Sequence, residues 1–146
     1  MSELRLTRRF AAPPERVFAA WTEPELLRCW WAALAGWQTA LAEVDLRPGG
    51  RYRLTMHDPA TGAEYTVTGE YVDVVPPERL AYTWTWEGDA EIMRGSEGTL
   101  VTVDFAEAGE GTEVVLRHGR FAGDGIRDLH CEGWAGCLAN LKGALE

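Results

Sequence analysis

The feature that most constrains the fold is a change of periodicity near the end of the chain. Between residues 126 and 145, apolar side chains fall on one broad stripe at the spacing of an α-helix. From about residue 37 to residue 119 the pattern has a period of two and is rich in aromatic residues, as in strands. A helix with one apolar stripe must be covered, and an aromatic sheet face can cover it. We therefore expect an α+β fold in which a curved antiparallel sheet wraps around a long C-terminal helix, with room for a ligand between them.

The N-terminal part predicts one strand and two short helices. The strand covers residues 3–10 and is followed by a helix that opens at Pro14, because proline suits the first turn of a helix. Pro24 opens a second short helix, capped by Thr22 or Glu23. We expect the apolar face of this second helix to include Trp30 and Trp31, with one ring filling the pocket and the other lying outside it. Anchoring of the helix to the sheet is an equally good reading of the pair.

The rest of the sheet follows from alternation and from turn residues. We expect strands over residues 38–47, 51–57, 65–75, 80–87, 101–105 and 113–118, a loop over residues 88–97, and the C-terminal helix capped by Asp124 or Asp128. A break of phase in the third of these strands predicts a β-bulge between Gly69 and Asp73. Nearly every strand has one polar face, which is typical of an antiparallel sheet covered on one side only.

Composition excludes several classes of protein. The 146 residues suit one domain, over residues 1–146, and need no disulfide or metal to fold. A net charge of −9 argues against nucleic-acid binding, which requires clustered cations. No stretch has the length and hydropathy of a membrane span or of a signal peptide. Three cysteines without paired spacing fit reduced thiols, so we expect a cytoplasmic protein that contacts no membrane.

The inward-facing aromatic and histidine residues are the candidate ligand site. Large rings on a concave sheet hold it away from the helix, and their indole and phenol groups can orient a bound molecule. Each ring taken alone is also explained by core packing. The expected ligand-binding residues are Trp30, Tyr52, Met56, Tyr82, Trp84, Trp86, His118, His130 and Trp134.

No catalytic residue or cofactor is assigned. His118 and His130 are candidates for an acid–base pair, but a carboxylate that would orient such a base is not identifiable, and hydrogen-bonded structural histidines explain them equally well. Of His130, Cys131 and Cys137, helical geometry puts His130 and Cys137 near one side of the helix, and a clear third ligand is lacking, so no metal site is predicted.

Five segments resemble the activator-of-Hsp90-ATPase-like family, within the START-like (SRPBCC, helix-grip) superfamily. Their order and spacing are similar to the family pattern over nearly the whole chain. The segments are Phe10 to Leu27, Trp30-Trp31, Asp45 to Tyr52, Pro77 to Trp84 and His130 to Leu141.

The resemblance implies a helix-grip fold with a cavity between the sheet and the C-terminal helix. The aromatic inner face and the lack of a catalytic set predict binding of a small apolar or aromatic molecule there, without assigned chemistry. The resemblance leaves open a small enzyme of the cyclase, hydratase or hydrolase type, and a co-chaperone or stress-related protein-binding module. The co-chaperone that names the family has an extra N-terminal domain for which 146 residues leave no room, so we do not expect direct contact with Hsp90. An exposed sheet edge makes a homodimer possible.

Overall fold

The computed structural model describes residues 2–32, 36–88 and 95–146. Within these residues the chain forms a seven-stranded sheet and three helices, which confirms the α+β helix-grip prediction. In chain order the elements are β1 (Ser2–Phe10), α1 (Pro14–Thr22), α2 (Pro24–Leu27), β2 (Gln38–Val44), β3 (Arg51–His57), β4 (Glu64–Val75), β5 (Arg79–Trp86), β6 (Thr99–Ala108), β7 (Gly111–Phe121) and α3 (Asp124–Leu145).

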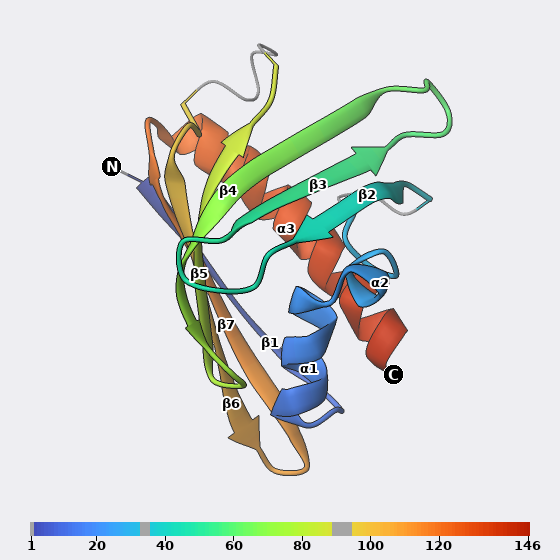
Figure 1. The fold of residues 1–146 in the computed structure, drawn as a ribbon, viewed down its shortest axis with the longest axis vertical. Coiled ribbons are helices and arrows are strands. Elements are labelled where there is room, and N and C mark those ends of the chain that lie inside the picture. Colours follow the sequence, from blue (N-terminus) through green and yellow to red (C-terminus); the bar gives the residue numbers. More distant parts are fainter. Residues whose placement is uncertain (1, 33–35, 89–94) are drawn as a thin grey trace.

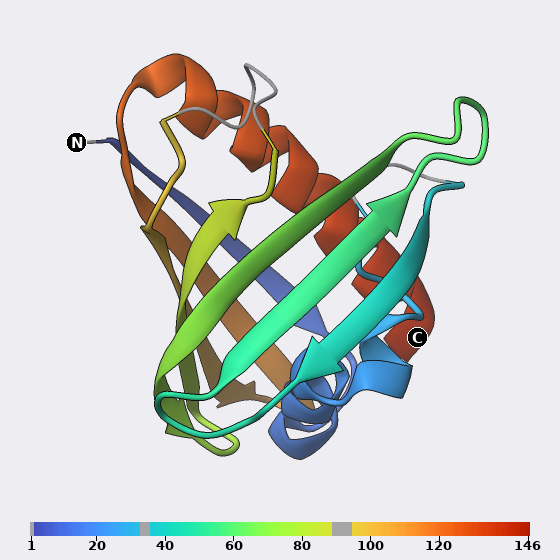
Figure 2. The ribbon, with the colours of Figure 1, turned by 45° about the horizontal axis from the view of Figure 1, so that its top comes forward.

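The sheet is antiparallel throughout, in the order β1-β7-β6-β5-β4-β3-β2. Strands β2 to β7 follow one another as a meander, and β1 completes the sheet by pairing with the last strand. Figure 1 shows that the sheet bends so strongly that its two halves meet at an angle, with α3 lying in that angle. The second view, in Figure 2, shows the same helix passing behind β2, β3 and β4.

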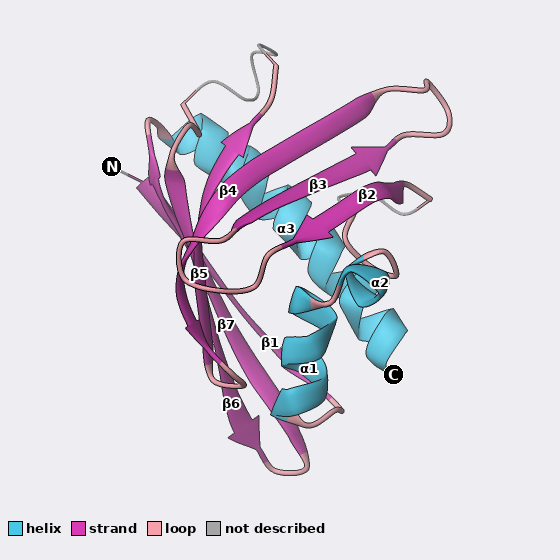
Figure 3. Cartoon of the chain, in the orientation of Figure 1, coloured by secondary structure: helices cyan, strands magenta, loops and turns pink. Residues whose placement is uncertain are grey.

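The helices cover the concave side of the sheet unequally. α3 approaches β1 and β7 more closely than the other strands, while α1 packs on β6 and β7 and α2 packs on β2 (Figure 3). The distance between α3 and the β2–β5 half of the sheet is therefore bridged by large side chains. This arrangement decides where the aromatic residues meet.

The predicted bulge lies in β4, where the register with β5 shifts between Tyr71 and Asp73. Close to it, Gly69 faces Tyr52 across the β3–β4 pair. The phenol ring of Tyr52 crosses the glycine, and its hydroxyl donates to the carbonyl oxygen of Thr83 on β5 at 2.5 Å. A Cβ atom on residue 69 would collide with that carbonyl and with the ring, so the crossing requires glycine.

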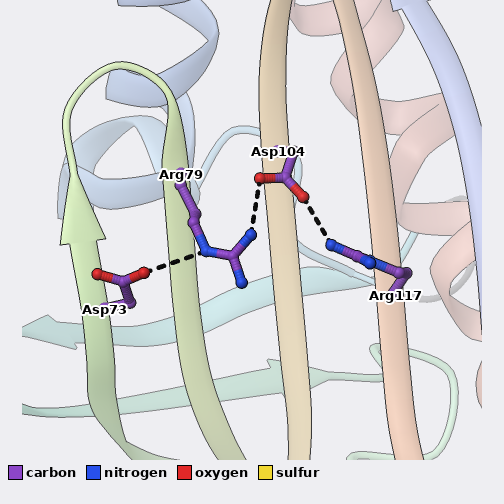
Figure 4. Close-up of polar contacts among 4 residues, drawn as sticks. All are labelled: Asp73, Arg79, Asp104 and Arg117. Carbon is purple, nitrogen blue, oxygen red and sulfur yellow. Dashed lines mark hydrogen bonds and ion pairs between the residues drawn. The ribbon is translucent and has the colours of Figure 1, made fainter.

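The convex face carries a row of alternating charges across four strands, which we call the ion-pair ladder (Figure 4). Arg79 on β5 donates to Asp73 on β4 and to Asp104 on β6, each at 3.1 Å, and Arg117 on β7 donates to Asp104 at 2.9 Å. The four side chains are between 36% and 46% exposed, so solvent screens the pairs and each one contributes modestly.

The predicted cap of the C-terminal helix was wrong. The C-terminal helix has Gly123 at its N-cap, without a side-chain cap hydrogen bond. Asp124 instead lies in the first turn, where its charge complements the helix dipole, and Asp128 pairs with Arg127 at 2.9 Å. α2 has Glu23 at its N-cap, which is one of the two predicted residues, without a side-chain cap hydrogen bond.

The second short helix also ends earlier than predicted, at Leu27. Trp30 and Trp31 therefore lie in the turn that follows the helix. Both side chains are 2% exposed, so neither lies outside the core. Of the predicted loop over residues 88–97, positions 89–94 lie outside the described residues.

Candidate functional site

Strand β5 brings the largest side chains onto the concave face. Alternation places Tyr82, Trp84 and Trp86 on the side that faces α3, as the sequence predicts. Trp84 is 4% exposed and lies at the centre of a group of rings. Its ring centroid is 5.2 Å from those of His118 and Trp134 and 5.3 Å from that of Trp86.

We define the aromatic cluster as Trp84, Trp86, His118, Phe121, His130 and Trp134. Its members come from β5, β7 and α3, so it joins the sheet to the helix. His118 and Phe121 have ring centroids 4.4 Å apart, and Phe121 lies 4.9 Å from His130. The tertiary structure thus brings together five of the nine predicted site residues.

His118 has a partner at each ring nitrogen. The indole Nε1–H of Trp134 donates to Nδ1 of His118 at 3.0 Å, and Nε2 lies 2.8 Å from the hydroxyl oxygen of Thr99. Because Nδ1 accepts, the proton belongs on Nε2, which donates to Thr99, whose own hydroxyl donates to a backbone carbonyl oxygen at 2.8 Å. Burial, with a smaller contribution from the neighbouring His130, holds the pKa of His118 well below its ordinary value.

His130 adopts the opposite tautomer. Its Nε2 accepts from the indole Nε1–H of Trp86 at 2.9 Å, and its Nδ1–H donates to the carbonyl oxygen of Ile126 at 2.8 Å. Burial lowers the pKa of His130, and the bond to the backbone carbonyl partly offsets that effect. Both histidines are therefore neutral near pH 7, and both of their lone pairs are already engaged by tryptophan donors.

This arrangement does not resemble an acid–base pair. A general base needs a lone pair free to take a substrate proton, and an orienting carboxylate normally supports it. The described residues include no buried Asp, Glu, Lys or Arg. The geometry thus favours hydrogen-bonded structural histidines, the second of the two readings of the sequence.

A second group of rings, the tyrosine cluster, consists of Tyr52, Tyr71 and Tyr82. Their ring centroids lie 5.1 to 6.0 Å apart. Burial raises the pKa of all three phenols, so they remain protonated. Trp21 connects the two clusters: its indole N–H donates to the hydroxyl of Tyr82 at 3.2 Å, and its ring stacks on that of Trp134 at 6.3 Å.

The remaining predicted residues lie around these clusters. Trp30 contacts Trp21 with a centroid distance of 4.8 Å, and its indole N–H donates to the Ala20 carbonyl at 2.9 Å. Met56 is buried in the core from β3.

Several contributors were not among the predicted site residues. The periodicity of the sequence already placed Trp21 and Tyr71 on inward faces, so it could have identified both residues as contributors to the site. Trp31, whose ring centroid is 6.4 Å from that of Trp84, was expected as one of the pair of tryptophans that plugs the pocket or anchors the helix. Thr99 carried no signal of its role.

Buried polar atoms without a hydrogen-bond partner occur at three positions in the described part of the chain. Two of them, His57 Nδ1 and Arg117 Nε, belong to side chains that already contact a carboxylate, at 3.3 Å and 2.9 Å. The third is the indole Nε1–H of Trp84. An indole has one donor and no acceptor, so this side chain has no other means of satisfying its polar atom.

A groove of about 460 Å³ lies between β2, the segment after α2 and the C-terminal half of α3. This volume is within the range of small-molecule pockets. Trp30 alone of the nine predicted residues is among its described lining residues, beside Arg28, Asn140 and Gly143. Gly143 leaves open space where a Cβ atom would stand.

Other chemistries find little support in the described residues. Three or more His, Cys, Asp or Glu side chains are nowhere grouped there so as to hold a metal ion. Burial raises the pKa of the Cys137 thiol to about 12, which leaves it unreactive. No helix within residues 2–32, 36–88 and 95–146 is long and apolar enough to cross a membrane.

Comparison with known proteins identifies the family. The family model for activator of Hsp90 ATPase homolog 1-like proteins matches residues 11–146. The chain belongs to this family. The match confirms the resemblance seen in the sequence and places the chain in the START-like superfamily.

Solved structures of similar proteins have the same fold over nearly the whole chain. A protein from Chromobacterium violaceum is 29% identical with a TM-score of 0.83, the match covering 100% of this chain and 99% of that one. The AHSA1 protein from Silicibacter pomeroyi is 27% identical with a TM-score of 0.83, over 99% and 97% of the two chains. An AHSA1-like protein from Aeromonas hydrophila is 26% identical with a TM-score of 0.81, over 98% and 91%. No curated protein sequence matches the chain.

Proposed function

We propose that this family member binds a small apolar or aromatic molecule between the sheet and α3. The observation that carries the proposal is the surroundings of Trp84. Its indole N–H is buried without an acceptor among the described residues, and rings from three different elements surround it. An apolar wall with a few polar groups directed inward is the usual form of a small-molecule site.

The nine predicted residues supply both parts of such a site. The rings and Met56 provide apolar surface, and the indoles and phenols provide orientation. The absence of charge among the buried described residues favours an apolar ligand over an ionic one, since burying an unpaired charge is costly.

The two other functions are less well supported. An enzyme acting through His118 or His130 would first have to break a hydrogen bond from Trp134 or Trp86 to free a lone pair. For a co-chaperone role, the described residues provide no specific contact surface. Strands β1 and β2 form the edges of the sheet, and a homodimer through either of them stays a prediction. That the protein makes no direct contact with Hsp90 also stays a prediction.

The first experiment is native mass spectrometry of freshly purified protein, with organic extraction of anything bound. We expect a small molecule at a stoichiometry close to one. The substitution Trp84→Phe should reduce its occupancy, whereas Trp37→Phe, outside both clusters, should retain it. Trp37 stacks on Tyr65 near the start of β4 with ring centroids 5.6 Å apart, and it lines the groove described above, so its substitution controls for the loss of an indole away from the aromatic cluster.

The groove provides a test of location. Gly143 lines the groove, and a Cβ atom added there meets no atom within 4 Å; the same holds at Gly125, which lies at the opposite end of α3 and away from the groove. A ligand held by the aromatic cluster should survive both Gly143→Leu and Gly125→Leu. Loss of the ligand in Gly143→Leu alone would move the site to the groove.

If the purified protein carries nothing, fluorene serves as an apolar aromatic probe in equilibrium dialysis. Saturable binding of fluorene to the wild-type protein supports the function. Absence of saturable binding in the wild-type protein would contradict it.

A further inference from the structure

We propose that the ligand is a neutral molecule with a carbonyl-type acceptor, and that Trp84 donates its indole N–H to that oxygen. This inference rests on the proposed function and specifies the chemistry of the ligand. Ketones, quinones and lactones of aromatic or alicyclic character belong to this class. Hydrocarbons, carboxylates and amines do not.

The first step in the argument is the pairing of the other indoles around Trp84. Trp134 donates to His118, Trp86 donates to His130, and Trp21 donates to the hydroxyl of Tyr82. These acceptors are therefore already paired with the indole N–H groups of the other three tryptophans. Trp84, at the centre of the same rings, is the member whose N–H reaches none of them.

The second step concerns which acceptors remain. Nδ1 of His118 and Nε2 of His130 are the lone pairs of the two neutral rings, and both are occupied. Rotating His118 toward Trp84 would leave the buried indole of Trp134 unpaired, and rotating His130 would leave the half-buried indole of Trp86 unpaired. A buried donor without a partner costs free energy. A ligand whose acceptor pairs with that donor therefore binds more tightly by the free energy of the hydrogen bond.

The third step concerns charge. The buried polar residues described are threonines, one serine and the two histidines. A carboxylate has no cation to pair with there. An ammonium group has no anion, and the nearby histidine lone pairs are already occupied. A neutral oxygen acceptor is the chemistry that satisfies a single N–H donor without leaving a charge buried.

The test compares three molecules with one planar skeleton: 9-fluorenone, which has a carbonyl oxygen, fluorene, which lacks it, and fluorene-9-carboxylate, which is charged. Affinities are measured by equilibrium dialysis at pH 7.5 for wild type, Trp84→Phe and Trp37→Phe. We expect the wild-type protein to bind fluorenone about tenfold more tightly than fluorene, the scale of one buried hydrogen bond relative to an unpaired donor. Fluorene is the more hydrophobic of the two, so simple partitioning predicts the opposite order.

In Trp84→Phe the preference for fluorenone should disappear, because the donor is gone while the aromatic surface is largely kept. Trp37→Phe should retain the preference. The carboxylate should bind the wild-type protein at least tenfold more weakly than fluorenone.

The outcomes separate this inference from the function on which it rests. Equal affinity for fluorenone and fluorene in the wild-type protein would overturn the acceptor assignment and leave apolar ligand binding intact, with the Trp84 N–H paired to water or unpaired. A preference that persists in Trp84→Phe would overturn Trp84 as the donor. Absence of saturable binding of both molecules would overturn the function and this inference together.

A second measurement covers the case in which Trp84→Phe fails to fold. In the wild-type protein labelled with ¹⁵N in its indole groups, one indole proton should shift downfield with fluorenone but not with fluorene. Equal responses to the two molecules would overturn the proposal.

Discussion

The hydrogen bonds of His118 predict a specific loss of stability in acid. The folded protein requires the neutral ring, since Nδ1 accepts from Trp134 and Nε2 donates to Thr99. Protonation would place a second N–H against the indole donor in a buried site. The group therefore binds protons more readily in the unfolded chain, where its pKa is about 6.5, than in the folded protein, where burial holds the pKa well below that value.

The direction of the effect follows from this difference. The contribution of His118 is fully present above pH 6.5 and decreases as the pH falls toward the folded pKa. Each pH unit below the unfolded value costs about 1.4 kcal/mol, so a ring that stays neutral to pH 5 loses about 2 kcal/mol of unfolding free energy between pH 7.5 and pH 5. That is a substantial part of the 5–15 kcal/mol typical of a domain. His130, whose pKa is lowered in the same direction, adds to the loss.

The assay is urea denaturation of wild type and of His118→Gln at pH 7.5 and pH 5. Glutamine does not titrate, and its amide can both donate and accept. The variant should be less stable than wild type at pH 7.5, but it should lose about 2 kcal/mol less on acidification. His57→Gln, which lies outside the aromatic cluster, is the control for loss of a histidine. The reasoning is refuted if His118→Gln loses as much stability in acid as wild type, or if His57→Gln shows the same protection.

Three further predictions concern stability and are measured by chemical or thermal denaturation. Gly69→Ala should destabilise the protein by more than about 2 kcal/mol, because its Cβ would collide with the Thr83 carbonyl; a change under 1 kcal/mol would contradict the close approach. Gly143→Ala should stabilise the protein by up to about 1 kcal/mol through helix propensity, because the added Cβ meets open space. A loss of stability would contradict this open space. Gly125→Ala is the matched change at the other end of α3. Asp104→Asn should cost roughly 1 kcal/mol at low salt by removing the centre of the ion-pair ladder, and less in 1 M salt; a cost independent of salt would argue against an electrostatic origin.

Periodicity in the sequence determined the secondary structure and the direction of most side chains. Alternation placed Trp84 and His118 on the covered side of the sheet, and helical spacing placed His130 and Trp134 on the covered side of the helix. These are local properties, because the side-chain period of a strand or helix follows from backbone geometry alone. The break of phase near Gly69 likewise located the bulge.

Helix termini were predicted less well. An aspartate near the start of a helix satisfies the cap pattern equally well one residue inside it. In this chain Gly123 takes the extended cap conformation, and Asp124 lies in the first turn. The C-terminal end of α2 was misplaced because the buried tryptophans after Leu27 continue the helical spacing although the backbone is no longer helical there.

What only the tertiary structure decided is the pairing of the polar groups. Trp84, His118 and Trp134 come from β5, β7 and α3, and their contacts depend on sheet curvature, strand register and the position of α3 against β1 and β7. No sequence pattern states that two indoles meet histidine lone pairs while a third meets no acceptor. Each neutral histidine has a single acceptor nitrogen. The position of that nitrogen in the folded protein therefore determines which neighbouring indole donor is paired and which is not.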